Sequence, residues 1–113
     1  MRRMQTVAEM PEFIRNAKRL LGDEEIQTLI SYLAEHPSSG VRMAGTGGVR
    51  KLRWACEGRG KSGGVRVIYY FHSERLPLYL LTVFGKNEKA NLSKAEANAL
   101  SKLVKLLIQV SRD

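Results

Sequence analysis

The run Val65-Arg66-Val67-Ile68-Tyr69-Tyr70-Phe71-His72 carries the strongest secondary-structure signal in the chain. β-Branched and aromatic residues fill it, which is typical of a strand packed inside a sheet. Two further runs, 49–56 and 78–84, flank it and are also expected to be strands. The connections between the three runs are short or rich in glycine, which favours antiparallel pairing of neighbouring strands.

Two amphipathic helices are expected before these strands. Apolar residues recur at helical spacing over 11–21, and Pro11 is favourable as the first residue of a helix. Asp23 is a good N-cap for a second helix, which Pro37 ends. Two helices with so short a connection predict a helical hairpin near the N-terminus.

The remaining segments complete an α+β domain. Residues 4–8 are expected to form a short first strand, and residues 37–48, which contain Pro, Ser and several glycines, a loop. Ser93 and Glu96 predict the capping box of a last helix. This order predicts a single domain over 1–113, with the helices packed on one face of a mostly antiparallel four-stranded sheet.

Positive charge is concentrated in the middle of the chain. The sequence has 19 Lys and Arg against 11 Asp and Glu, a formal net charge of +8. Residues 37–66 carry seven basic residues and one acidic residue, whereas residues 1–36 carry five basic and six acidic residues. Clustered charge of one sign is typical of a surface that binds a polyanion, and a solvated basic surface without a ligand is the alternative.

Alternation along the strands predicts where this charge lies. Successive side chains of a strand point to opposite faces, so Lys51 and Arg53 share one face, and Arg66 and Tyr70 share one face of the next strand. Cations and an aromatic ring on an open sheet face suit the phosphates and bases of RNA. Arg66 is the most informative of them, because a guanidinium inside an apolar strand is costly without an anionic partner.

The third strand is expected to alternate in the same way. Tyr79, Leu81 and Val83 would then face the helices, and Phe84 would lie on the opposite, charged face. Lys86, just beyond this strand, continues in register with Phe84.

The sequence contains no pattern that indicates a metal site or a cofactor. The glycine-rich segment 58–63 lies between two strands rather than between a strand and a helix, so it does not indicate a dinucleotide site. Cys56 is the single cysteine, and His36 and His72 have the spacing of ordinary surface residues. With no secretory signal and no apolar run of the ~18 residues that span a membrane, we expect a cytoplasmic protein without a membrane segment.

RNA cleavage is possible with such a residue set. The 2′-OH of RNA is an internal nucleophile, so a protein need only orient it and neutralise the charge that develops on the phosphate. Arginine and lysine perform the second task well, and the same set would be poor at cutting DNA.

The sequence resembles toxins of the RelE/ParE superfamily, in its HigB-like branch. Three stretches carry the resemblance: 45–54, with Lys51 and Arg53; 58–70, with Arg66; and Gly85-Lys86-Asn87-Glu88-Lys89 followed by Asn91-Leu92-Ser93. The resemblance implies a RelE-like fold and a toxin of a type II toxin–antitoxin pair. Such a toxin is an endoribonuclease that works without metal and cleaves mRNA in the ribosomal A site.

The resemblance also assigns roles to individual residues. Lys51 and Arg53 match the basic strand pair that holds the scissile phosphate, and Arg66 matches the arginine that stabilises the transition state. Lys86 and Lys89 match a basic segment after the last strand. The four expected catalytic residues are therefore Arg66, Lys51, Arg53 and Lys86. We further expect RNA contacts from Arg50, Arg59, Lys61, Tyr70, Asn87 and Lys89.

Two positions depart from the family pattern. Asn87 replaces a second arginine of the basic segment, and Ser93 stands where a tyrosine is found near the start of the last helix. The identity of the general base therefore stays open. Lys51 and Glu88 are two options, and the third is that the 2′-OH loses its proton with little help from the protein.

The resemblance also implies the partners. They are the ribosome, its mRNA and a cognate antitoxin of the helix-turn-helix type. The toxin would contact operator DNA only through this antitoxin. Two alternatives stay open: a ParE-like inhibitor of a DNA topoisomerase, and a non-catalytic relic that binds RNA or a partner.

Overall fold

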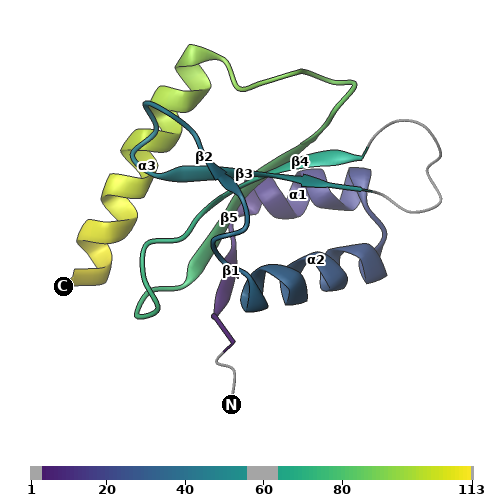
Figure 1. Ribbon diagram of the computed structural model, residues 1–113. Coiled ribbons are helices and arrows are strands. Elements are labelled where there is room, and N and C mark those ends of the chain that lie inside the picture. The colour runs from purple at the N-terminus through teal and green to yellow at the C-terminus, as the bar shows by residue number, and fades with distance from the viewer. Residues whose placement is uncertain (1–3, 56–63, 113) are drawn as a thin grey trace.

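The computed structural model describes residues 4–55 and 64–112 and shows three helices and five strands (Figure 1). In chain order these are β1 (Val7–Glu9), α1 (Pro11–Leu20), α2 (Asp23–Glu35), β2 (Val41–Arg42), β3 (Val49–Trp54), β4 (Val65–Tyr70), β5 (Leu78–Gly85) and α3 (Lys94–Arg112). Among the described residues, no helix is long and apolar enough to cross a membrane.

The five strands form one sheet in the order β1-β5-β4-β3-β2. All neighbours pair antiparallel except β1 and β5, which pair parallel. The α+β class and the mostly antiparallel sheet are confirmed, whereas the expected number of four strands is wrong. The additional strand, β2, consists of two residues inside the segment expected to be a loop, which is too short to show a periodic pattern.

The local signals at the helix ends are mostly confirmed. Pro11 is the first residue of α1, and Ser93 and Glu96 form the predicted capping box of α3, with Ser93 N–H donating to Glu96 Oε1 at 2.8 Å and Glu96 N–H to Ser93 Oγ at 3.1 Å. The N-cap of α2 is Gly22 rather than Asp23. The Gly22 N–H donates to the Glu25 carboxylate at 2.9 Å, so the cap is supplied from inside the helix.

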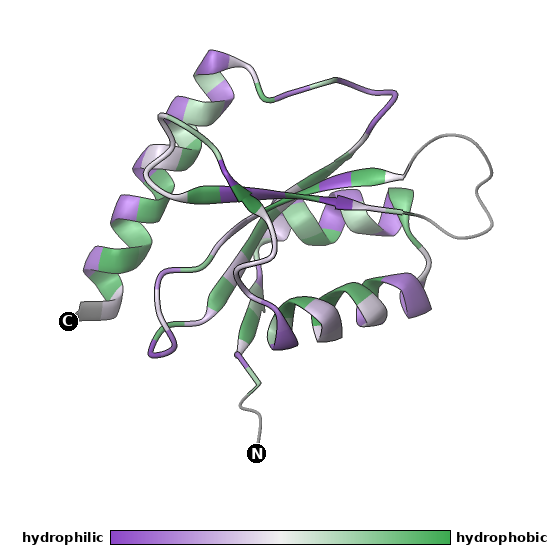
Figure 2. Cartoon of the chain, in the orientation of Figure 1, coloured by the Kyte–Doolittle hydropathy of each residue, from purple (hydrophilic) through white to green (hydrophobic). Residues whose placement is uncertain are grey.

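The helices cover both faces of the sheet, which corrects the expectation that they share one face. The first core lies beneath the helical hairpin and contains Phe13, Leu29, Val67 and Tyr69. The second core contains Val49, Ile68, Tyr70, Leu81, Phe84 and Val104, packed against the apolar side of α3. Figure 2 shows apolar and polar residues alternating along α3.

The reason for two covered faces lies in β4. All six of its residues are buried, and all except Arg66 are apolar on whichever face they lie. A strand with apolar side chains on both faces must be covered twice. The sequence expectation assigned one face to solvent because Lys51, Arg53 and Arg66 lie on it, and it gave too little weight to Ile68 and Tyr70.

A β-bulge interrupts the alternation of β5. Ile68 pairs with Thr82 and Tyr69 with Leu80, so Leu81 has no partner in β4. Leu80 and Val83 consequently contribute to the hairpin core, and Leu81 and Phe84 to the core under α3. The expectation that Leu81 and Val83 share a face is therefore wrong, because one extra residue in a strand reverses the facing of everything that follows it.

Candidate functional site

Arg66 lies in the middle of the sheet, on the face that α3 partly covers. The residue is 9% exposed, and in the described part of the chain its guanidinium makes one hydrogen bond, from Nη1 to the Val65 carbonyl at 3.5 Å. That distance is at the outer limit of a hydrogen bond. No carboxylate among the described residues pairs with it. Arg66 is therefore a nearly buried cation for which residues 4–55 and 64–112 supply no counter-ion.

The strand register brings a second cation and an aromatic ring beside Arg66. Arg53 of β3 is its direct neighbour on one side, and Phe84 of β5 is its direct neighbour on the other. Directly opposed side chains lie about 4.5–5.5 Å apart at Cβ, where two like charges repel each other. Arg53 is exposed and can turn toward water, which relieves part of this repulsion, and an anion bound between the two guanidinium groups would relieve the rest.

Lys51 lies on the same face, two residues before Arg53. Its Nζ donates to Asn91 Oδ1 at 2.9 Å, which connects β3 to the segment between β5 and α3. An ammonium that donates to a neutral amide keeps its positive charge and two further donors. Lys51 is therefore fixed in position and still available to an anion.

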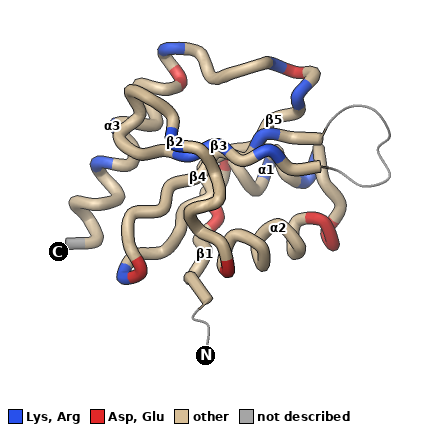
Figure 3. The backbone as a smooth tube through the Cα atoms, in the orientation of Figure 1, with Lys and Arg blue, Asp and Glu red and all other residues tan. Residues whose placement is uncertain are grey.

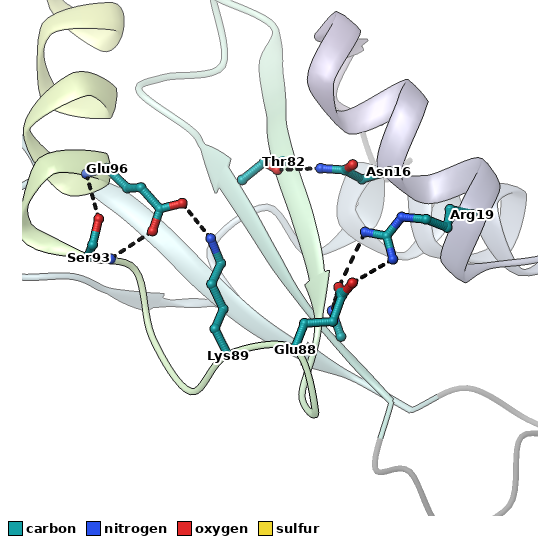
Figure 4. A network of polar contacts seen from close by, with 8 residues as sticks. Asn16, Arg19, Thr82, Glu88, Lys89, Ser93 and Glu96 are labelled. Atoms are coloured by element: carbon teal, nitrogen blue, oxygen red, sulfur yellow. Dashed lines mark hydrogen bonds and ion pairs between the residues drawn. The ribbon is translucent and has the colours of Figure 1, made fainter.

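The segment that follows β5 adds two more cations. Lys86 is exposed, and its backbone N–H donates to the Gly64 carbonyl at 3.2 Å, which continues the β4–β5 ladder beyond Arg66. The Lys89 Nζ lies 4.9 Å from the centre of the Phe84 ring and 2.5 Å from Glu96 Oε2 (Figure 4). Lys89 therefore covers the aromatic neighbour of Arg66 while a helix carboxylate balances its charge.

Glu88 holds this segment against α1. Its two carboxylate oxygens accept from Arg19 at 2.6 and 3.3 Å, and one of them also accepts from the Gly85 N–H at 2.7 Å (Figure 4). The Arg19 guanidinium, followed by the Gly85 N–H, lowers the pKa of Glu88 below its ordinary value. Because a lower pKa makes a weaker base, this contact makes Glu88 a poorer general base than a carboxylate without it.

Two expected RNA contacts lie apart from this cluster. Arg50 is oriented away from Arg66, and its Nη1 donates to the carbonyls of Ser38 and Gly40 at 3.1 and 2.7 Å. Tyr70 is 4% exposed beneath α3, so its ring is not available on an open sheet face as expected. Burial raises the pKa of the Tyr70 hydroxyl above its ordinary value.

Of the other residues expected to contact RNA, the structure describes Asn87 and Lys89. Asn87 is exposed in the turn after β5, close to Lys86 and Lys89. Arg59 and Lys61 lie outside the described residues. The structure thus brings together Lys51, Arg53 and Arg66, with Lys86, Asn87 and Lys89 along the adjoining segment. Figure 3 shows the basic positions of β3 and β4 side by side near the centre of the sheet.

Phe84 was expected on the charged face, and the sheet register places it beside Arg66. Two other residues that contact the cluster or the segment beside it were not predicted from the sequence. Asn91 reaches Lys51 across forty positions. Arg19, on α1, holds Glu88 from a helix expected only to cover the core. Asn91 lies in one of the stretches that carried the family resemblance, which is the one signal that could have singled it out.

The cluster contains no histidine. His36 contacts Tyr32, and His72 contacts Tyr70, at the far end of β4 from Arg66. Within residues 4–55 and 64–112, no three His, Cys, Asp or Glu side chains come together as a metal site. The chemistry available from the described side chains is therefore anion binding by arginine and lysine, with Lys51 as the titratable group held by a single amide.

The family model for the RelE toxin of the RelE/RelB toxin–antitoxin system matches residues 7–113. The chain belongs to the RelE toxin family. Its fold is similar to that of the E. coli toxin RelE, solved in the free state as a double arginine-to-alanine mutant. The TM-score is 0.55 at 14% sequence identity, over 76% of this chain and 87% of that one. At this identity the likeness establishes a RelE-like fold, and the family model establishes the membership in the RelE toxins.

Proposed function

We propose that this RelE-family toxin is an endoribonuclease that cleaves mRNA in the ribosomal A site and so inhibits translation. The observation that carries the proposal is the Arg66 guanidinium, which is nearly buried, lacks an anionic partner in the described part of the chain, and has Arg53 beside it. A phosphate of the RNA backbone would supply the missing anion with the bidentate geometry that a guanidinium favours.

The proposed reaction uses the 2′-OH of the substrate as the nucleophile. Its oxygen attacks the adjacent phosphorus in line, the bond to the 5′-oxygen of the next nucleotide breaks, and a 2′,3′-cyclic phosphate and a 5′-hydroxyl are formed. The 2′-OH proton leaves to a base, and the departing 5′-oxygen takes up one proton. Charge builds on the phosphate oxygens, so donors fixed at Arg66 and Lys51 before the reaction would lower the barrier.

Each cation would have a different part in this reaction. Arg66 would stabilise the developing phosphate charge, since its burial strengthens electrostatic interactions. Arg53 and Lys86, both exposed, would hold the backbone on either side of the cleaved bond. Lys51, fixed by Asn91, would as an ammonium deliver a proton to the departing 5′-oxygen, and only as a neutral amine would it accept the 2′-OH proton. The lowered pKa of Glu88 weakens it as a general base, and the other two options are Lys51 and a 2′-OH that loses its proton with little help.

The proposed partners follow from the family. A cognate antitoxin, expected to be a helix-turn-helix protein, would neutralise the toxin and alone contact operator DNA. Membership of the HigB-like branch is part of the proposal, with Asn87 and Ser93 as the departures to explain. In this chain Ser93 caps α3, so the position serves the helix and does not supply an acid or base to the cluster.

The test compares mRNA bound to ribosomes with an empty A site and the same mRNA free in solution. Wild type, Arg66→Ala and the matched control Arg75→Ala, which removes an exposed arginine from the 71–77 connection, are incubated with both, and the ends are mapped by primer extension. We expect cuts on the ribosome by wild type and control, and a loss of about 10²–10³-fold in cleavage rate for Arg66→Ala.

Three outcomes would contradict the proposal in different ways. Folded Arg66→Ala that cuts at the wild-type rate would remove the assigned role of Arg66. Absence of cleavage by folded wild type, together with inhibition of DNA supercoiling, would favour the ParE-like function. RNA binding without turnover by wild type would favour a non-catalytic relic.

A further inference from the structure

A second basic and aromatic site lies at the other end of the sheet face that carries Arg66. It is a cavity of about 330 Å³ between β2, the turn before β3, the end of β4 and the C-terminal half of α3. The side chains that matter at its wall are those of Arg42, Tyr70, His72 and Ile108. Its volume falls at the lower end of the ~300–1,000 Å³ that ligand pockets occupy.

Two glycines give the cavity its shape. Gly47 and Gly48 line it with φ of 76° and 110°, a left-handed conformation that other residues rarely adopt. A Cβ on Gly48 would lie 3.3 Å from Cε1 of Tyr70, closer than an ordinary contact. The glycines therefore bring the backbone against the Tyr70 ring and leave the space in front of it open.

The aromatic part of the cavity is a pair of nearly parallel rings. The rings of Tyr70 and His72 are inclined by 20°, with their centres 6.1 Å apart, and the Tyr70 hydroxyl lies 3.2 Å from Nδ1 of His72. Tyr70 is buried, whereas His72 is exposed. An incoming planar group can therefore stack on the imidazole, which Tyr70 holds in place from behind.

The charged part is Arg42. Its side chain is exposed on β2 and lies close enough to lower the pKa of the Tyr70 hydroxyl, against the larger effect of burial. No described carboxylate forms an ion pair with Arg42, and no acidic side chain lines the cavity. A planar aromatic platform beside a guanidinium that forms no ion pair among the described residues is complementary to a base that carries a phosphate.

We propose that this cavity binds one nucleotide of the RNA strand, with the base against His72 and the phosphate at Arg42. This proposal rests on the proposed function, because it assumes that an RNA strand passes over Arg66. It adds a second site, away from the cleaved bond, at which the same RNA is recognised. Tyr70 lies four residues along β4 from Arg66, a separation of roughly 13 Å at about 3.3 Å per residue. A strand held at both places is therefore fixed over more than one nucleotide.

The route between the two places runs along the outer strands. α3 covers Ile68, which lies between Arg66 and Tyr70, so the direct path over β4 is closed. On β3, Lys51 follows Arg53 on the same face and pairs with Val41 of β2, the residue before Arg42. Val41 is 72% exposed, which leaves this edge uncovered. Arg53 and Lys51 extend the cluster along β3 to the β2 edge, where Arg42 lines the cavity.

The first experiment detects nucleotide binding without any cleavage. The full-length protein is titrated with adenosine monophosphate at constant pH, and the ring signals of the chain's two histidines are followed by NMR. We expect a saturable shift of His72, with His36 unchanged as an internal control because it lies against Tyr32 on α2. Arg42→Ala should weaken the apparent affinity about tenfold, since a hydrogen bond to a charged group is lost.

Matched variants and ligands decide the outcome. Arg75→Ala, which removes an exposed arginine outside the cavity, should bind adenosine monophosphate like wild type. No shift of His72, or an equal shift in Arg42→Ala, would overturn the proposal. Inorganic phosphate that shifts His72 as strongly as the nucleotide would overturn the assignment to a base and leave a general anion site.

A second measurement separates this proposal from the proposed function. A short 2′-O-methyl RNA, which lacks the free 2′-OH and cannot be cleaved, is bound to wild type, Arg42→Ala, Arg66→Ala and the double variant. We expect each single change to weaken binding and the double change to weaken it further. If His72 responds to the nucleotide but the protein does not cleave mRNA on ribosomes, the cavity stands and the nuclease fails. If the protein cleaves mRNA but His72 does not respond, the nuclease stands and the nucleotide cavity fails.

Discussion

The two faces of the sheet are built from the same long strands and differ in what they leave uncovered. Under the helical hairpin the side chains of β4 and β5 are apolar and sealed, with Phe13, Leu29 and Val67 fully buried. On the opposite face α3 seals Ile68 and Tyr70 and stops short of Arg66. One face therefore serves stability alone, whereas the other is divided between a core and a site for an anion.

The largest expected effect tests the sealed face. Phe13→Ala removes a fully buried ring from the hairpin core, and the free energy of unfolding should fall by about 3–5 kcal/mol. Urea denaturation followed by circular dichroism measures this. A loss below about 1 kcal/mol would mean that the core relaxes around the deletion, and that the two faces differ less in packing than the structure indicates.

On the face that carries α3 and Arg66, we expect a substitution that does not lower the free energy of unfolding. Arg66→Met replaces a nearly buried guanidinium, which has no anionic partner among residues 4–55 and 64–112, by an apolar side chain of similar length. Replacing buried ionic groups by apolar ones is often neutral or stabilising by about 1–4 kcal/mol, so the free energy of unfolding should stay the same or rise. The same denaturation experiment checks it. A marked destabilisation would indicate that Arg66 has a structural partner and is not held ready for an anion.

Two adjacent tyrosines give a matched comparison of the faces. The Tyr69 hydroxyl accepts from the Gly40 N–H at 2.7 Å and donates to the Pro37 carbonyl at 2.9 Å, all within the hairpin side. Tyr69→Phe leaves the buried Gly40 N–H without a partner and should cost about 1–3 kcal/mol. Tyr70→Phe removes a hydroxyl whose one hydrogen bond within the described residues is to the exposed His72, so its cost should be smaller. Equal losses of unfolding free energy in the two variants would mean that the two tyrosine hydroxyls, and so the two faces, do not differ in this respect.

The smallest effect concerns the exposed ion pair beside the cluster. Lys89, followed by the Ser93 N–H, lowers the pKa of Glu96, so the pair stabilises the fold above the ordinary carboxyl pKa of 4.5 and is lost as the pH falls through the lower, folded value. Glu96→Gln should therefore cost below about 1 kcal/mol at neutral pH and nothing in acid. Thermal unfolding of wild type and Glu96→Gln as a function of pH measures this difference. A loss of stability that persists in acid would contradict the explanation.

The sequence predicts best what depends on neighbouring residues. Pro11 at the start of α1 and the Ser93–Glu96 cap of α3 are predictable because each signal spans one helical turn. The family resemblance and the cost of a guanidinium in an apolar strand both single out Arg66 from the sequence alone. The environment of Arg66, nearly buried and unpaired among the described residues, agrees with that argument.

What the sequence did not predict depends on distant contacts. β2 exists only because Val41 and Arg42 meet β3, and the side on which α3 packs is set by β4 rather than by α3. The contact of Asn91 with Lys51 joins two segments with no shared local pattern. Arg50 was assigned to the site from its charge, but its guanidinium is engaged by the backbone of the 38–40 segment.

Because of the bulge, β5 has one residue, Leu81, that pairs with no residue of β4. Leu81 separates a half paired with β1 and the end of β4 from a half that carries Val83 and Phe84. Deleting Leu81 would preserve every pairing on either side of it, whereas deleting Val83 would bring Phe84 into the hairpin core. β5 can therefore shorten by one residue at a single place without exchanging its two faces. Length variation among relatives of this chain should concentrate there.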